Sequence, residues 1–97
     1  MPTRITQVED RDDKVILLRV EGKLLREDAE LLEKVCADLR EKEFDSRITL
    51  DLADLTFLDS ESASVLCRIK REQRVMLEGL QIFVQRAVEL ADRDEAA

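Results

Sequence analysis

The sequence predicts an α/β fold: a single domain spanning residues 1–97, with a mixed four-stranded sheet and helices packed mainly on one of its faces. Three observations lead to this prediction. A chain of 97 residues suffices for one domain with a modest core. Short runs rich in Val, Ile and Leu alternate with longer segments whose apolar residues recur at helical spacing. Each of the last two expected strands follows a helix, and such crossovers favour a parallel central pair.

Two strands are expected at residues 3–8 and 14–20, joined through a polar turn into an antiparallel hairpin. The second strand is apolar on both faces, so we expect it to be central or covered by helices. Gly22 marks a turn or bulge where this strand ends. One face of the strand carries Ile16, Leu18 and Val20, and the other carries Val15 and Leu17.

Residues 26–43 are expected to form the first long helix, because their apolar side chains recur at three- and four-residue steps. Charged side chains cover the rest of this helix, as on a solvated surface. Phe44 is expected to fold back onto the core, and residues 45–46 turn into the next strand. The apolar stripe consists of Ala29, Leu32, Val35, Cys36 and Leu39.

The middle of the chain joins a buried strand to a polar helix start. Apolar and polar residues alternate from 47 to 52, which predicts the strand, and a loose connector follows to residue 58. Asp59 or Ser60 is placed to cap the unpaired N–H groups of the next helix. Glu61 brings a negative charge to the positive end of the helix dipole. Helix capping alone is a sufficient structural reason for these residue types.

The second helix is expected to run from about Ser60 to Leu77, with Gly79 ending it. Its inner stripe comprises Ala63, Leu66 and Ile69, extended by Val65, Gln73 and Met76. A basic outer patch either complements the negative end of the helix dipole or docks an acidic partner. This patch comprises Arg68, Lys70, Arg71 and Arg74.

The last expected strand is 80–84, and residues 86–97 begin as an amphipathic helix. From about residue 92 to 97 the helix gives way to a polar tail that is expected to fray.

Composition narrows the classes of function. Sixteen Lys and Arg against 23 Asp and Glu give a net charge of −7, which argues against a nucleic-acid partner. No apolar run has the length of a membrane span, and the first ten residues lack the apolar core of a signal peptide. We therefore expect a cytoplasmic protein with no membrane insertion.

Two cysteines and the lack of histidine bear on metal and catalytic chemistry. Cys36 and Cys67 fall on or beside apolar helix faces, so we expect both to be free and buried. With no His and no CxxC pair, neither a metal site nor a cofactor is expected. An enzyme has little support, because Asp54 and Asp59 show no sign of the defined separation that paired catalytic carboxylates need.

The chain resembles the STAS domain found in anti-sigma factor antagonists and at the cytoplasmic ends of sulfate transporters. The family pattern is a strand ending in Asp-Leu, a spacer, an apolar-Asp-Ser-Ser-Gly turn and an apolar helix. Here it reads Asp51-Leu52 and then Thr56-Phe57-Leu58-Asp59-Ser60-Glu61-Ser62. Gly79-Leu80 with Ile82-Phe83-Val84 matches the glycine before the family's last strand. The resemblance covers nearly the whole chain and implies a small mixed sheet with a protein-interaction function.

One departure from the family pattern concerns the site that a kinase partner modifies in phosphorylated members. That second serine of the turn is Glu61 here, and the following glycine is Ser62. Glutamate carries about one negative charge where phosphoserine carries roughly 1.5 to 2. Glu61 is therefore either a phosphomimetic residue or the mark of a branch without the phosphoswitch. Ser60, Ser62 and Ser64 are alternative acceptors nearby.

The favoured interpretation is a non-catalytic interaction module of bacterial regulation. Its protein partner would be an anti-sigma factor, a serine kinase or another signalling subunit. The alternatives are an adaptor subunit of a transporter or other complex, and a STAS module that binds a small anion or nucleotide. The expected partner-binding residues are Asp54, Asp59, Ser60, Glu61, Ser62 and Ser64, with a secondary docking patch at Arg68 and Arg71.

Overall fold

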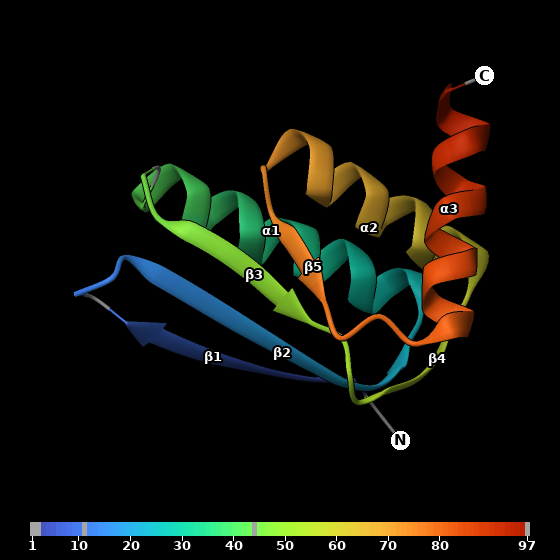
Figure 1. Cartoon of the computed structure of the whole chain (residues 1–97), viewed down its shortest axis with the longest axis horizontal. Helices are drawn as coiled ribbons and strands as arrows, with labels where there is room; N and C mark the ends of the chain where they lie inside the picture. Colours follow the sequence, from blue (N-terminus) through green and yellow to red (C-terminus); the bar gives the residue numbers. More distant parts are fainter. Residues whose placement is uncertain (1–2, 11, 44, 97) are drawn as a thin grey trace.

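The computed structural model describes residues 3–10, 12–43 and 45–96. Within these residues the chain forms five strands and three helices (Figure 1). The strands are β1 (Arg4–Asp10), β2 (Val15–Leu24), β3 (Arg47–Asp51), β4 (Leu55–Leu58) and β5 (Met76–Glu78). The helices are α1 (Arg26–Lys42), α2 (Ser60–Glu72) and α3 (Ile82–Ala96). The predicted mixed α/β fold is confirmed, with five strands in place of four.

The sheet is organised around β2, as its apolar composition predicts. β1 pairs with it as an antiparallel hairpin, and the strand order is β1-β2-β3-β5. β3 pairs parallel to β2, and β5 pairs parallel to β3, which confirms the predicted parallel pair. At Gly22, where φ is 88°, the register shifts by a bulge, as predicted. The strand does not end there: Lys23 and Leu24 continue β2 and pair with β4.

The core lies between the sheet and two helices that cover one of its faces. Figure 1 shows α1 passing behind β3 and β5 and α2 above them, with α3 standing at one end beside α2. The predicted face of β2, with Ile16, Leu18 and Val20, is buried beneath them. On the opposite face Val15 and Leu17 are only half-buried. β2 is therefore a central strand, but helices cover only one of its faces. Its second face is flanked by the neighbouring strands and has no helix packed on it within the described residues.

Both cysteines belong to this core and are free, as expected. Burial, assisted by the nearby charge of Glu33, raises the pKa of the Cys36 thiol to about 12. The Cys67 thiol donates to the carbonyl of Val88 at 3.2 Å, which links α2 to α3. The raised pKa of the Cys36 thiol is the opposite of the lowered pKa that reactive cysteines need. The stripe predicted for α1 also faces the core, with Ala29, Leu32 and Cys36 buried and Val35 and Leu39 partly so. The expectation for Phe44 lies outside the described residues.

The region after α2 differs from the prediction. α2 ends at Glu72 rather than near Leu77, and Met76–Glu78 forms β5 instead of helix. Gly79 follows this strand and does not terminate a helix. Its φ is 69°, and a Cβ placed there would lie 2.7 Å from the backbone nitrogen of Ala53. The glycine therefore permits a close approach of the chain after β5 to the turn after β3.

Residues 80–84 are not the last strand, because α3 begins at Ile82. The short apolar run at residues 80–84 fits either a strand or a helix, and the burial pattern shows that a helix forms. Val84, Val88 and Ala91 are buried at helical spacing, whereas Ile82 is 74% exposed. The Gln81 side chain fixes the start of the helix by donating to the carbonyls of Ala53 at 2.6 Å and Leu55 at 3.0 Å. The helix continues to Ala96, through the segment expected to be a polar tail.

β4 is the strand that the sequence does not reveal. It occupies part of the connector expected between strand and helix. Its ends, Leu55 and Leu58, are buried, while Thr56 and Phe57 are exposed, so the alternation typical of a strand is absent. Its pairing partner is the extension of β2 beyond Gly22, which lies more than thirty residues earlier in the chain. β4 sets the position at which α2 begins.

Candidate functional site

Asp59 connects the starts of both long helices. It is the N-cap of α2, and its Oδ1 accepts from the backbone N–H of Ser62 at 2.7 Å. Its Oδ2 accepts from the backbone N–H of Arg26, the first residue of α1, at 3.2 Å. The N-cap of α1 is Leu25, which offers no side-chain acceptor. One carboxylate therefore satisfies otherwise unpaired N–H groups of two helices.

This arrangement favours the ionised carboxylate. Burial raises the pKa of Asp59, but hydrogen bonds from Ser62 and from the Arg26 backbone outweigh burial and hold the pKa below its ordinary value of 3.8. The folded state therefore gains stability from Asp59 above that value. The gain is lost as the pH falls through the lowered pKa.

Three of the predicted residues lie on the accessible side of the first turns of α2. Ser60 and Glu61 are exposed and Ser64 is half-buried. The Glu61 side chain is 61% exposed, and its Oε2 lies 3.5 Å from Nε of Arg26. The Ser64 hydroxyl donates to the carbonyl of Ser60 at 3.3 Å. Glu61 and Ser64 form an accessible ridge one helical turn long.

Ser62 lies on the opposite side of this turn and is fully buried. Within the described residues its hydroxyl oxygen has no hydrogen-bond partner. A hydroxyl with no access to solvent is not open to a modifying enzyme in this conformation. Ser60 and Ser64 are the serines of this segment that remain accessible, so the expectation for Ser62 as a contact or acceptor has no geometric support.

A groove runs between the first turns of α2 and the middle of α3. Its volume is about 490 Å³, and it is lined by Ser60, Glu61, Ser64, Ala87, Leu90 and Ala91. Leu90 is 59% exposed and Phe83, two turns earlier on α3, is 40% exposed. Side chains at 83, 87 and 90 share one face of a helix. The groove therefore combines an apolar wall with a wall that carries two serines and a carboxylate.

The apolar wall on α3 was not predicted as part of the site. The signal was present, because the 83, 87 and 90 positions follow helical spacing. The prediction of a strand at 80–84 hid only Phe83, since a strand places successive side chains on opposite faces. Ala87, Leu90 and Ala91 were expected on a helix, but the packing of that helix against α2 was not predicted.

Asp54 does not join this cluster. It is exposed in the turn before β4, and its carbonyl accepts from the N–H of Gly22 at 3.2 Å. The whole of β4 separates it from Asp59, a span of about 16 Å at the usual rise of a strand. The two carboxylates therefore do not form a pair.

The predicted secondary patch divides in the structure. Arg68 donates to both carboxylate oxygens of Glu33 on α1, with Nε–Oε2 at 2.5 Å and Nη2–Oε1 at 2.8 Å. This bidentate bond holds α1 against α2. Arg71, one turn later, is exposed and lines a separate hollow with residues of α3. Arg68 therefore has a structural role.

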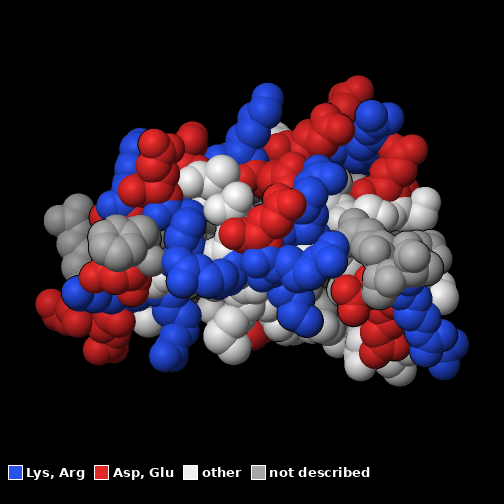
Figure 2. Space-filling model, turned by 90° about the horizontal axis from the view of Figure 1, so that it is seen from above, with Lys and Arg blue, Asp and Glu red and all other residues white. Residues whose placement is uncertain are grey.

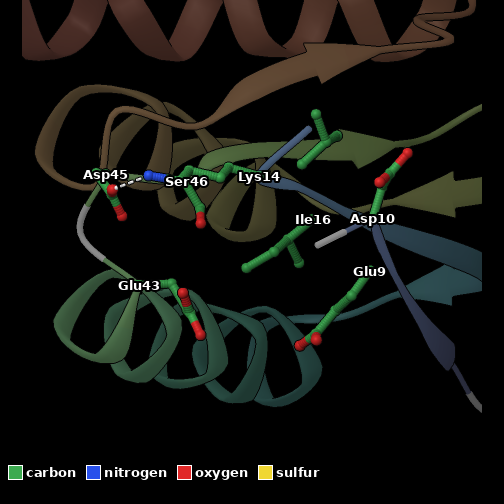
Figure 3. Close-up of a pocket in the computed structure, with 8 residues that line it drawn as sticks. Glu9, Asp10, Lys14, Ile16, Glu43, Asp45 and Ser46 are labelled. Atoms are coloured by element: carbon green, nitrogen blue, oxygen red, sulfur yellow. Dashed lines mark hydrogen bonds and ion pairs between the residues drawn. The ribbon is translucent and has the colours of Figure 1, made fainter. Parts of the chain in front are cut away.

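A larger hollow, of about 560 Å³, lies away from the start of α2, between the β1–β2 hairpin and the end of α1. Figure 3 shows its carboxylates, from Glu9, Asp10, Glu43 and Asp45, around the pocket. Nζ of Lys14 lies 2.8 Å from Oδ2 of Asp45. Among the described residues no group of three or more Cys, Asp or Glu side chains has an arrangement that would hold a metal ion.

Comparison with known proteins places the chain in a family. A family model described as "Mlab, STAS domain" matches residues 8–95. A comparison with curated proteins gives no match. In the described part of the chain, none of the helices combines the length and apolar character needed to cross a bilayer.

Solved structures show the same fold. The anti-sigma factor antagonist SpoIIAA in its unphosphorylated form has a TM-score of 0.70 at 14% identity, over 97% of this chain and 100% of that one. An antisigma-factor antagonist STAS domain from Rhodobacter sphaeroides has a TM-score of 0.62 at 22% identity, over 79% and 86%. An uncharacterised protein from Shewanella loihica with a SpoIIAA-like fold has a TM-score of 0.58 at 18% identity, over 95% and 78%.

Proposed function

The chain belongs to the STAS-domain family. We propose that it is a non-catalytic protein-interaction module of bacterial regulation. It docks a protein partner through the first turns of α2 and the adjoining face of α3. The observation that carries this proposal is the groove at the family's motif, where exposed Glu61 and half-buried Ser64 face Leu90 across a hollow. Interfaces commonly combine such an apolar centre with a polar rim.

The cap explains how this surface is held ready. Asp59 satisfies the first N–H groups of α1 and α2, so the turn keeps its shape without a ligand. Glu61, which lies two residues later and is exposed, is left to face a partner. Binding then requires little ordering of the backbone, which reduces its entropic cost.

Glu61 supplies a permanent negative charge in this surface. At the corresponding position of phosphorylated family members the charge depends on a kinase. We propose that Glu61 determines which partner binds. A partner surface that leaves the Glu61 carboxylate without a compensating positive charge is disfavoured. Charge at this position then selects between partners instead of switching one of them.

An adaptor role in a transporter or another complex uses the same surface and differs only in the partner. A small-anion or nucleotide function is less well supported. The carboxylate of Asp59 already occupies the Ser62 N–H group in the first turn of α2, where an anion would bind, and the charge of Glu61 repels an anion.

Affinity capture with the wild-type chain and with Glu61→Ser tests the proposal. Mass spectrometry identifies the captured partner and any phosphate, and titration of the purified partner then gives its Kd for both forms. We expect Glu61→Ser to change the Kd by about tenfold, as the removal of a charged side chain from a protein interface commonly does.

Glu41→Gln is the matched control, since Glu41 is an exposed carboxylate at the far end of α1. Equal affinity of the Glu61→Ser and Glu41→Gln proteins for the partner would remove Glu61 from the docking surface. A regulatory kinase or anti-sigma factor as the partner supports the regulatory role, and a transporter subunit supports the adaptor role.

A further inference from the structure

The end of α2 carries a cluster of cations that neither the fold nor the proposed docking groove explains. Arg40 of α1 reaches across to this end and donates to the carbonyls of Gln73 at 2.8 Å and Arg74 at 3.1 Å. A third bond, at 2.7 Å, goes to the carbonyl of Ser46. Arg40 therefore acts as a C-terminal cap for α2 and joins it to the start of β3.

Arg74 lies beside this cap in an unusual backbone conformation. Its φ is 53°, in the left-handed region that glycine and asparagine adopt most readily. Burial, and then the adjacent charge of Arg74, lower the pKa of Arg40, so the two guanidinium groups repel each other. A strained backbone and like charges in contact are both unfavourable for the isolated fold, which is a reason to look for a function.

Arg40, Arg47 and Arg74 line one hollow of about 400 Å³ at this end of the molecule. Met76, which is 51% exposed, forms an apolar part of its wall. Asp45 is the carboxylate in the lining, and its Oδ2 already lies 2.8 Å from Nζ of Lys14. Arginine and methionine are both enriched at protein interfaces.

Four cations elsewhere in the described part of the chain are paired with carboxylates. Each of Lys14, Arg19, Arg26 and Arg68 has a carboxylate oxygen within 4.0 Å. Among the residues that the structure describes, neither Arg47 nor Arg74 has such a partner, nor does Lys70 on the last turn of α2. Figure 2 shows the molecule from above the view of Figure 1, with Lys and Arg side chains in a band across its middle. In a protein of net charge −7, such a band is complementary to an acidic partner.

We infer that Arg47 and Arg74, with Met76, form a second docking surface that binds an acidic segment of the partner protein. This inference rests on the proposed function, because the acidic segment belongs to the partner that docks at the start of α2. Thirteen residues of α2 separate the two surfaces, about 20 Å along the helix axis, which one partner of ordinary size spans.

Titration with an oligoglutamate peptide, followed by backbone amide NMR, tests the surface without the partner. We expect shifts centred on residues 47, 74 and 76, no shifts with an oligoglutamine peptide, and weaker binding at high salt. The double variant Arg47→Gln, Arg74→Asn removes two cations, and asparagine tolerates the left-handed backbone. Its affinity for the peptide should fall about tenfold.

Lys34→Gln, which removes an exposed cation of α1, is the matched control and should leave the peptide affinity unchanged. Shifts spread over all basic residues, or an affinity unaffected by the double variant, would overturn the inference. So would shifts that depend on protein concentration without peptide, since these show that a second copy occupies the surface. Failure of the proposed function appears separately, in partner binding by the Glu61→Ser variant and its Glu41→Gln control.

Discussion

A charged side chain holds each end of α2 and joins it to α1. The two side chains come from different distances along the sequence. Asp59, at the start, caps Ser62 three residues ahead of it. Arg40, at the end, caps Gln73 from 33 residues away. A local cap can be recognised in a sequence, and a distant cap cannot. The start of α2 was therefore predicted within one residue, and its end was predicted about five residues too late.

The two ends also differ in what the cap leaves exposed. At the start, one carboxylate satisfies both helices and Glu61 remains outside as a negative side chain. At the end, Arg40 satisfies the carbonyls and Arg74 remains outside as a positive one. α2 therefore presents an acidic surface and a basic surface at its two ends, which would orient a partner along it.

Removal of the distant cap should have the largest effect on stability. Arg40→Ala leaves three carbonyl groups without their charged donor, and we expect a loss of roughly 2–4 kcal/mol in the free energy of unfolding. Arg40→Lys should lose about half as much, since an ammonium group reaches fewer of these carbonyls. Urea denaturation measures both. A loss no greater than that of Lys34→Ala, on the exposed side of α1, would contradict the role of the cap.

Removal of the local cap should have a smaller effect. Asp59→Ala frees one N–H group on each helix, and we expect a loss of roughly 1–2 kcal/mol in the free energy of unfolding. Asp59→Asn retains one acceptor oxygen and should lose less. In hydrogen exchange, Asp59→Ala should accelerate the amides of both Arg26 and Ser62. Acceleration of the Ser62 amide alone would show that the bond to α1 contributes nothing.

The pH dependence of stability separates the two ends further. The pKa of Asp59 is lowered in the folded state, so its contribution is present above the unfolded pKa and is lost as the pH falls below about 3.8. Asp45, whose hydrogen bond to Lys14 lowers its pKa, adds to the loss in the same range. Urea denaturation across this range should show a shallower decline for Asp59→Asn than for wild type. An equally steep decline would mean that Asp59 makes no net contribution.

The smallest effect is expected at Ser62. Its buried hydroxyl has no partner in the described part of the chain, so Ser62→Ala removes an unsatisfied group. The free energy of unfolding should stay the same or rise by up to about 1 kcal/mol. Ser64→Ala, on the exposed side of the same helix, is the control and should change it by less than about 0.5 kcal/mol. A clear loss for Ser62→Ala would show that the hydroxyl does have a partner in solution.

The sequence predicts this fold best where the relevant contacts are local. The β1–β2 hairpin and α1 follow from alternation and helical spacing within single segments. β4 and β5 do not, because they have four and three residues and exist through pairing with β2 and β3. Too short to show a period, they are recognisable only when their neighbours in the sheet are known.

The candidate site divides in the same way. Asp59, Ser60 and Glu61 were predicted from the capping pattern and the family motif, and they lie together at the start of α2. The opposite wall of the groove was missed, since Leu90 joins the site only through the packing of α3 against α2. Arg68 was assigned to a docking patch because its sequence neighbours are basic, whereas its partner, Glu33, lies 35 residues away.

Site-specific photo-crosslinking tests the docking surface most directly. A photoreactive residue placed at Glu61 or Leu90 should crosslink to the same partner protein, since both side chains face the groove between α2 and α3. The same residue at Thr6, exposed on β1, should not. Partner crosslinks at 61 and 90 but not at 6 are the predicted result. Equal crosslinking at all three positions, or at Thr6 alone, would contradict the proposal that this chain acts through the start of α2.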